Sequence, residues 1–196
     1  MNKLNAVLVY CGASAGKNPL YTEETKRVGK VFVDENIQLI YGGGSIGLMG
    51  VLADSILSAG GKVTGVIPAF LNVKEVGHTG CTQLHVVNSM HERKALMEKL
   101  CDGVIVLPGG YGTLDEMFEM LTWSQLGLHQ KPIGILNLNA YYDNLIAQLD
   151  VMVREGFIST ENRQLFVIDE SIEKLIAKMR AFDATTKEQW LNRAGT

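Results

Sequence analysis

Short apolar runs alternate with longer segments in which apolar residues recur every three or four positions, and this pattern repeats along almost the whole chain. The short runs are rich in Val, Ile and Leu, which is typical of strands buried on both faces of a parallel sheet. The longer segments are typical of helices that cover such a sheet with one apolar side. The pattern predicts strands over residues 5–11, 37–41, 62–68, 84–88, 103–107, 131–137 and 164–168. It predicts helices within residues 21–35, 47–61, 90–101, 108–126, 141–156 and 171–182.

Strands and helices that alternate in this way predict an α/β fold, a three-layer Rossmann-like arrangement with a parallel sheet between helices on both faces. A chain of 196 residues is long enough for one domain with a substantial core, and no linker or low-complexity tract divides it. We therefore expect residues 1–196 to form a single domain. The polar C-terminal segment contains Trp190 and Leu191, and we expect this pair to dock on the body of the protein or on a partner.

Composition narrows the class of function. The formal net charge is −3, whereas a dedicated nucleic-acid binder usually has a strong basic excess, so no nucleic-acid partner is expected. No apolar run approaches the roughly 20 residues that span a bilayer, and the N-terminus lacks the long apolar core of a signal peptide, so no membrane association is expected. Cys11, Cys81 and Cys101 form no CxxC pair and lie in or beside apolar runs. Buried free thiols of this kind favour a reducing compartment, and we expect a cytoplasmic location.

The histidines do not have the spacing of metal ligands. "HERKA" at His91 lacks the second His of HExxH, and the other three, His78, His85 and His129, are scattered. No protein-held metal is expected.

Loops rich in Gly and Ser follow several predicted strands. They include "CGASAGKNP" after the first strand, "GGGSIG" after the second and "PGGYGT" after the fifth, and ligands of open parallel sheets bind at these strand ends. Gly lets the backbone approach an anion and a helix N-terminus offers free N–H groups, so "PGGYGT" suits a phosphate monoester, with hydroxyl donors from Ser14 and Thr113. "GGGSIG" matches GxGxxG, but the next strand offers no acidic residue for a ribose and no Gly-Lys-Ser/Thr follows, so NAD binding and ATP hydrolysis are poorly supported. The alternative is that these loops are only tight strand-to-helix turns.

Two interpretations stay open for the carboxylates after the "PGGYGT" turn. "TLDE" has the form of a capping box, in which Thr113 caps the helix and Glu116 reaches back to the cap. Glu116 could also serve as a base or a cation stabiliser, held ionised by the field at the helix start, and the two roles need not exclude each other. Asp115 and Glu119 are expected to face solvent or to cap the helix.

The segment "MHERK" opens another helix and places two cations near its N-terminus. Arg93 and Lys94 are normally part of a solvated face, but cations at a helix start are mildly unfavourable, which indicates an anionic partner. The methionines at helical spacing are most simply core residues, some of which could line an apolar pocket: Met90, Met97, Met117 and Met120.

Taken together, "SMHERK" and "PGGYGTLDE" resemble the paired signatures MxxRK and PGGxGTxxE of the Lonely Guy (LOG) family. The segments "VYCGAS", "YGGGSIGLMG" and "KPIGILN" are also similar to the family, so the resemblance extends across nearly the whole chain. Members have often carried the label lysine decarboxylase, but nothing in the sequence supports a pyridoxal phosphate site. The resemblance implies a Rossmann-like nucleotide-binding domain over residues 1–196 that needs no cofactor. It implies hydrolysis of the N-glycosidic bond of cytokinin riboside 5′-monophosphates, which are N6-substituted forms of AMP, to free base and ribose 5-phosphate.

Carried over residue by residue, the resemblance gives catalytic roles to Arg93 and Glu116. With the loop residues considered above, the expected substrate- and phosphate-binding positions are Ser14, Gly43, Gly44, Met90, Lys94, Gly109, Gly110, Gly112 and Thr113. Breaking the glycosidic bond develops positive charge on the ribose, which an ionised Glu116 could stabilise while it orients a water onto the anomeric carbon. Arg93 could assist either the phosphate or the departing base.

Two other functions stay open. One is a general nucleosidase for AMP and other nucleoside 5′-monophosphates, and the other is a non-catalytic nucleotide-binding protein. The resemblance to family members of this length implies a homodimer. The segment Met117–Gly127, with Trp123 and Leu126, is apolar enough to form part of a dimer interface or to pack in the core. The expected partners are therefore a nucleoside 5′-monophosphate and a second copy of the chain.

Overall fold

The computed structural model describes residues 1–72 and 77–183 of the chain. Its centre is a seven-stranded parallel sheet in the order β4-β3-β2-β1-β5-β6-β7. The strands are β1 (Ala6–Tyr10), β2 (Gln38–Tyr41), β3 (Val63–Pro68), β4 (Gln83–Val87), β5 (Gly103–Val106), β6 (Ile133–Leu136) and β7 (Phe166–Asp169). The longer helices are α1 (Pro19–Asp34), α2 (Gly47–Ser58), α4 (Met90–Leu100), α5 (Tyr111–Gln125), α6 (Asp143–Arg154) and α8 (Ile172–Ala181).

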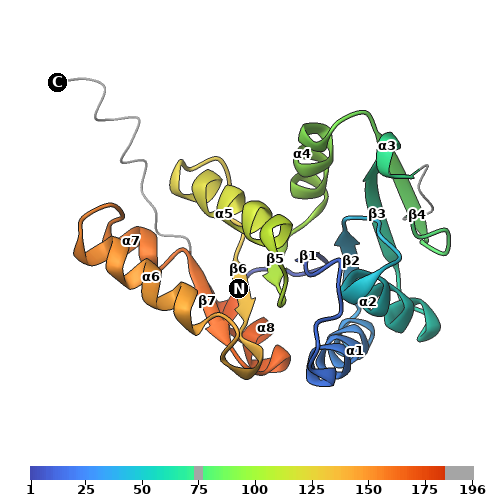
Figure 1. Cartoon of the computed structure of the whole chain (residues 1–196), viewed down its shortest axis with the longest axis horizontal. Helices are drawn as coiled ribbons and strands as arrows, with labels where there is room; N and C mark the ends of the chain where they lie inside the picture. The colour runs from blue at the N-terminus through green and yellow to red at the C-terminus, as the bar shows by residue number, and fades with distance from the viewer. Residues whose placement is uncertain (73–76, 184–196) are drawn as a thin grey trace.

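Helices cover both faces of the sheet, so the predicted three-layer α/β fold is confirmed (Figure 1). Helices α1, α2 and α8 pack on one face and α4, α5 and α6 on the other. Along β1, Val9 points into the first core and Leu8 into the second. Successive strand residues point to opposite faces, so a strand covered on both faces is apolar throughout. This explains the short continuous apolar runs.

The predicted elements are all present, and their ends differ by a few residues. Helix α1 begins two residues earlier than its apolar pattern indicates, because the side chain of Asn18 accepts a hydrogen bond from the Leu20 N–H (3.0 Å) and Pro19 occupies the first turn. Single-turn helices escaped prediction because they are too short for a periodic pattern: α3 (Ala69–Asn72), the 3-10 turn η1 (Leu138–Ala140) and α7 (Thr160–Arg163). Trp190 and Leu191 lie outside the described residues. Within residues 1–72 and 77–183, no helix has the length and apolar character needed to cross a membrane.

The direction of the strand order reverses beside β1, because β2 to β4 extend to one side of it and β5 to β7 to the other. Loops that leave β1 and β5 therefore diverge and open a crevice at the carboxyl ends of the strands. Backbone hydrogen bonds hold these loops together. The Gly12 N–H donates to Pro108 O and the Leu48 N–H donates to Gly12 O, each at 3.0 Å.

Candidate active site

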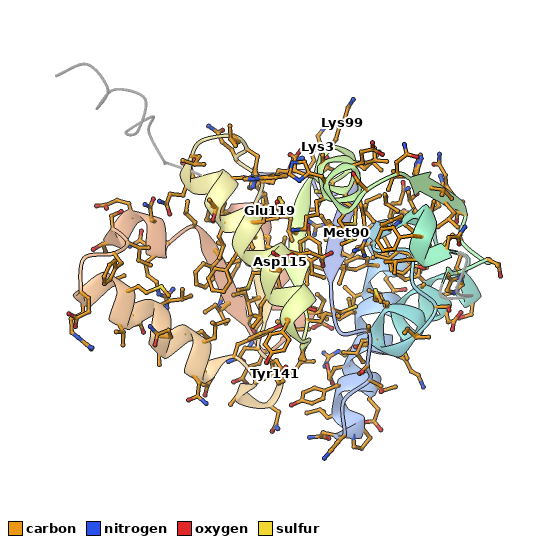
Figure 2. The ribbon with its side chains drawn as sticks, turned by 45° about the horizontal axis from the view of Figure 1, so that its top comes forward. Lys3, Met90, Lys99, Asp115, Glu119 and Tyr141 are labelled. Carbon is orange, nitrogen blue, oxygen red and sulfur yellow. The ribbon has the colours of Figure 1, made fainter. Side chains whose placement is uncertain are left out.

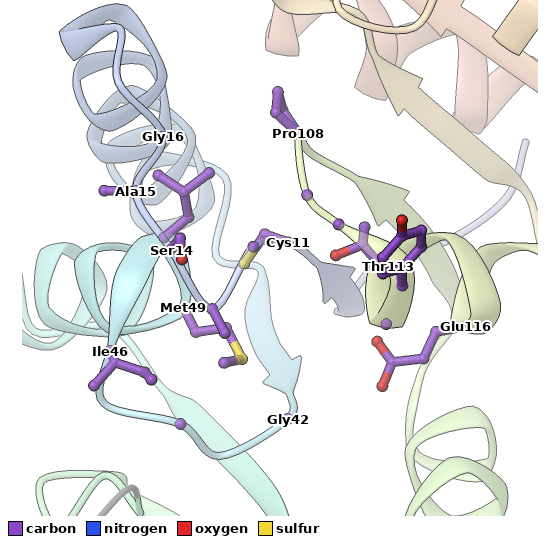
Figure 3. A pocket seen from close by; sticks show the side chains of 18 of the residues that line it. Cys11, Ser14, Ala15, Gly16, Gly42, Ile46, Met49, Pro108, Thr113 and Glu116 are labelled. Carbon is purple, nitrogen blue, oxygen red and sulfur yellow. The ribbon is translucent and has the colours of Figure 1, made fainter.

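A cavity of about 680 Å³ lies at this switch point, between the loops that follow β1, β2 and β5 (Figure 3). Most of the positions expected from the sequence line it: Ser14, Gly44, Arg93, Gly109, Gly110, Gly112, Thr113 and Glu116. Figure 3 shows the Glu116 carboxyl directed into the open space, with Ser14, Ile46 and Met49 on the opposite wall. Three of the expected residues, Gly43, Met90 and Lys94, are not part of the lining.

The turn between β5 and α5 presents backbone donors to this cavity. Gly110 is the N-cap of α5, and among residues 1–72 and 77–183 no side chain caps the helix start. The first N–H groups of a helix have no partner within the helix. A Cβ at Gly110 or Gly112 would meet nothing within 4 Å, which shows that the space around the turn is open. At Gly109 a Cβ would collide with the Thr113 side chain, so only Gly lets Thr113 pack against the turn. Free N–H groups and the positive end of a helix suit an anion such as phosphate.

The capping-box interpretation of "TLDE" is wrong. Helix α5 begins at Tyr111, so Thr113 lies inside its first turn and is buried, with 4% of its surface exposed. The extended backbone of Gly110 ends the loop three residues earlier than a cap at Thr113 requires. Glu116 is therefore free of a capping role and faces Arg93.

Arg93 extends from α4 across the ends of two strands. Its Nε donates to Val66 O at 3.1 Å and its Nη2 to Gly42 O at 3.2 Å, while Nη1 lies 3.2 Å from Glu116 Oε1. The two side chains are only 11% and 12% exposed. A Cβ at Gly42 would overlap the guanidinium, so this Gly makes room for Arg93. The sequence indicates an anionic partner for the cations at the start of this helix, and for Arg93 that partner is the Glu116 carboxylate of the same chain.

Burial raises the pKa of Glu116 from 4.5 to about 7, against the opposing effect of the positive charges of Arg93 and Lys94. The sequence predicts that the helix field holds this carboxyl ionised, whereas with a pKa of about 7 both protonation states are populated at neutral pH. Desolvation disfavours the charged form more than the helix start and the nearby cations favour it. A carboxyl with a pKa near 7 is suited to proton transfer in either direction.

Lys94 points to the outer side of α5. Its ammonium lies 2.8 Å from Asp115 Oδ2 and 3.0 Å from Glu119 Oε2. Burial would lower the pKa of Lys94, but the hydrogen bonds to these two carboxylates outweigh it and raise the pKa. The prediction that Asp115 and Glu119 face solvent or cap the helix missed this network, which joins α4 to α5 beside the Arg93–Glu116 pair.

Gly43 and Met90, which were also expected to bind the substrate, lie beside the cavity wall and are not part of it. Gly43 adopts a positive φ of 73° and packs against Ile67 and Leu84, so it shapes the loop from behind. Met90 is 37% exposed, and its sulfur lies 3.9 Å from Arg93 Nη1. The other methionines at helical spacing are in the core, as expected: Met97, Met117 and Met120.

Sequence reasoning missed the apolar and aromatic part of the cavity wall. Ile46, Met49, Ile67 and Leu71 line it, as do two tyrosines, Tyr21 and Tyr141. Ile46 lies in the "GGGSIG" loop, and its place after a predicted strand was the one feature of the sequence that could have marked it as a cavity residue. The others come from α2, β3, α3, α1 and the loop before α6, and no local pattern marks them as neighbours.

Cys11 also lines the cavity, at the end of β1. Burial raises the pKa of this thiol well above its usual value of 9, so it stays uncharged and is not an activated nucleophile. The three cysteines are free thiols. In the part of the chain that the structure describes, no group of three or more His, Cys, Asp or Glu residues is arranged to hold a metal ion.

Comparison with known proteins identifies relatives over most of the chain. A family described as possible lysine decarboxylase matches residues 49–179. The chain is 41% identical to the cytokinin riboside 5′-monophosphate phosphoribohydrolase LOG1 of Arabidopsis thaliana, over 96% of this chain and 91% of the relative. It is 45% identical to the cytokinin riboside 5′-monophosphate phosphoribohydrolase of Rhodococcoides fascians, over 90% of this chain and 89% of the relative.

Solved structures with the same fold include a molybdenum cofactor binding protein from Rippkaea orientalis, with a TM-score of 0.68 at 20% identity. A molybdenum cofactor carrier protein from Chlamydomonas reinhardtii has a TM-score of 0.67 at 18% identity. Each covers 91% of this chain, while the chain covers 97% and 98% of them, respectively. At such identities the likeness concerns the fold alone. The sequence relatives, the family match and the intact paired motifs together establish that the chain belongs to the Lonely Guy (LOG) family.

Proposed function

We propose that the chain hydrolyses the N-glycosidic bond of cytokinin riboside 5′-monophosphates, releasing the free base and ribose 5-phosphate. The observation that carries the proposal is that one cavity combines a helix N-terminus suited to phosphate with a buried Arg93–Glu116 pair. The relatives at 41% and 45% identity bear the name of this activity.

The proposed reaction begins with the 5′-phosphate on the N–H groups at the start of α5. Glu116 lies one and a half turns further along the same helix, so a phosphate bound there fixes the sugar relative to the carboxyl. The ionised carboxylate then stabilises the positive charge that develops on the ribose and takes a proton from the attacking water. The base leaves with the electron pair of the broken C–N bond and takes up one proton, so that the water is divided between the free base (H) and ribose 5-phosphate (OH). Arg93 holds the carboxylate in place through Nη1 and is itself fixed by Val66 O and Gly42 O.

The apolar wall of the cavity favours a substituted base over plain adenine. Ile46, Met49, Ile67 and Leu71 would contact an apolar group on the base, and burying such a group is favourable by about 25 cal/mol per Å². We therefore expect kcat/KM for isopentenyladenine riboside 5′-monophosphate to exceed that for AMP by at least about tenfold. A substrate panel that follows release of free base measures this ratio. Equal values would favour the general nucleosidase, and binding without any release of ribose 5-phosphate would favour the non-catalytic alternative.

The raised pKa of Glu116 gives an expected pH profile. The proposed base must be ionised, so kcat/KM should rise with pH through about 7 and fall about tenfold for each unit below it. Stability should change in the opposite direction. The fold favours the neutral carboxyl, so its contribution to stability is complete below pH 4.5 and is lost as the pH rises through about 7. Initial rates and urea midpoints from about pH 5 to about pH 9 test both trends, and rates that stay constant over this range would exclude Glu116 as the base.

The proposal includes a homodimer. Leu126 and Leu128 follow α5 and are 46% and 68% exposed, while Phe157, after α6, is 83% exposed. Helix α5 itself carries two further partly buried apolar side chains, Phe118 and Trp123. We expect light scattering to give about twice the chain mass of 21.5 kDa, and Leu128→Glu to shift the protein toward that single-chain mass. A wild-type mass of one chain at micromolar concentration would exclude a stable dimer.

The expected cytoplasmic location is also part of the proposal. It is supported by the free Cys11, Cys81 and Cys101, which suit a reducing compartment. Cell fractionation followed by immunoblotting tests it, and recovery of the protein from a secreted or membrane fraction would exclude it.

A further inference from the structure

The loop between β6 and α6 carries an unusual backbone. Asn139 has φ 52° and Ala140 has φ 57°, so two consecutive residues other than Gly adopt the left-handed conformation. This conformation is strained for residues with a Cβ, and it persists only where the surroundings enforce it. The strained pair lies directly before Tyr141, which lines the cavity.

The neighbouring residues fix this loop. Asn137 is buried; its Oδ1 accepts a hydrogen bond from the Tyr142 N–H (2.8 Å) and its Nδ2 donates to Asp143 Oδ1 (2.7 Å). Both partners lie at the start of α6, so the Asn137 side chain bonds the residues before Asn139 and Ala140 to the residues after them. The position of Tyr141 is thus set by a rigid loop.

Tyr141 reaches from this loop to the phosphate-binding turn. Its hydroxyl donates to Gly109 O at 2.6 Å, and Figure 2 shows Tyr141 beside the N-terminal end of α5. The ring makes edge contacts with Tyr21, at 5.7 Å between centroids, and with Tyr142, at 4.8 Å. The neighbouring Tyr142 bonds the residue just before the turn, because its buried hydroxyl donates to Leu107 O at 2.7 Å.

A carbonyl oxygen that faces an anion site weakens phosphate binding, because its lone pairs repel the phosphate dianion that the nearby N–H groups attract. The Tyr141 hydroxyl engages the Gly109 carbonyl, immediately before the free N–H groups of α5. Without the Tyr141 hydroxyl, the carbonyl of Gly109 loses the donor that the structure shows bonded to it.

We infer that Tyr141 is a positioning residue for the 5′-phosphate: it holds the Gly109 carbonyl so that the start of α5 presents donors alone, and it thereby makes the enzyme specific for phosphorylated nucleosides. The inference rests on the proposed function for the identity of the substrate. Selective binding of a phosphate ester, which the inference predicts, can be measured whether or not the protein turns over a substrate.

The test is Tyr141→Phe, which keeps the ring contacts and removes only the hydroxyl. We expect KM for the nucleoside 5′-monophosphate to rise about three- to tenfold, as the loss of one hydrogen bond implies, with kcat changed less than twofold. The dissociation constant of ribose 5-phosphate, measured by calorimetry, should rise by the same factor. The kcat/KM for the unphosphorylated riboside should be the same in the variant and the wild type.

A purely structural role makes a different prediction. It would lower Tm and affect the phosphorylated and unphosphorylated nucleosides equally, and such a result would overturn the inference, as would unchanged binding of ribose 5-phosphate. Tyr142→Phe is the matched comparison, because it removes the adjacent hydroxyl from a buried bond and is expected to act mainly on Tm. If the wild type hydrolyses no nucleotide, the proposed function fails, while the calorimetric comparison still decides the role of Tyr141.

Discussion

Replacing Glu116 by Gln is expected to reduce kcat by about 10²–10⁴ while the fold is retained, the range typical for loss of a positioned acid or base. The amide keeps the shape of the side chain but cannot accept the proton of the attacking water. Stability should hold, because the pKa of about 7 means that this site favours the neutral carboxyl over the charged one. An uncharged Gln therefore avoids the cost of burying a charge. Rates of ribose 5-phosphate release and Tm values for the two proteins measure both effects.

Asp115→Asn is the matched control, because it removes a carboxylate from the adjacent position of the same helix. Asp115 is 64% exposed and binds Lys94 outside the cavity. We expect it to keep kcat within about threefold of the wild type, since an exposed ion pair contributes at most about 1 kcal/mol. Near-normal turnover in Glu116→Gln would remove Glu116 from the mechanism, whatever the result at Asp115.

Replacing Arg93 by Ala is expected to affect both activity and stability. The guanidinium bonds Val66 O and Gly42 O, so the variant leaves two carbonyls without their donor and should lose about 1–3 kcal/mol of unfolding free energy. Loss of the positive charge should raise the pKa of Glu116 further, which moves the midpoint of the pH–rate profile upward. We expect kcat/KM near pH 7 to fall by about 10²-fold or more.

Arg93→Lys separates charge from geometry. A lysine restores a positive charge near Glu116 but not the planar group that contacts two carbonyls and a carboxylate at once. It should bring the pH midpoint back toward the wild-type value while recovering only part of kcat/KM. Lys94→Gln tests the alternative that the second cation of the motif holds the phosphate. Because Lys94 is bound by Asp115 and Glu119, we expect Lys94→Gln to change kcat/KM far less than Arg93→Ala does.

The candidate site was predictable where its residues are consecutive. "PGGYGT" after an apolar run indicated a glycine turn at a strand end, and the structure places Gly109, Gly110, Gly112 and Thr113 on the cavity wall. The pattern "TLDE" misled, because a capping box and a carboxylate one turn further into a helix look the same in sequence. Only the backbone of Gly110, which ends the loop before Tyr111, decides between them.

The sequence alone determined the alternation of strands and helices, since buried strands require apolar runs such as Val104–Val106 and covering helices require apolar residues every three or four positions. It also determined the family, through two motifs of fixed spacing. The tertiary structure decided which distant residues meet. Arg93 meets Glu116 because β1 and β5 are neighbours where the strand order reverses, and the pKa of the pair depends on burial that no local pattern encodes. Tyr141 meets Gly109 because β6, which precedes Tyr141, pairs with β5, which precedes Gly109, once the sheet assembles.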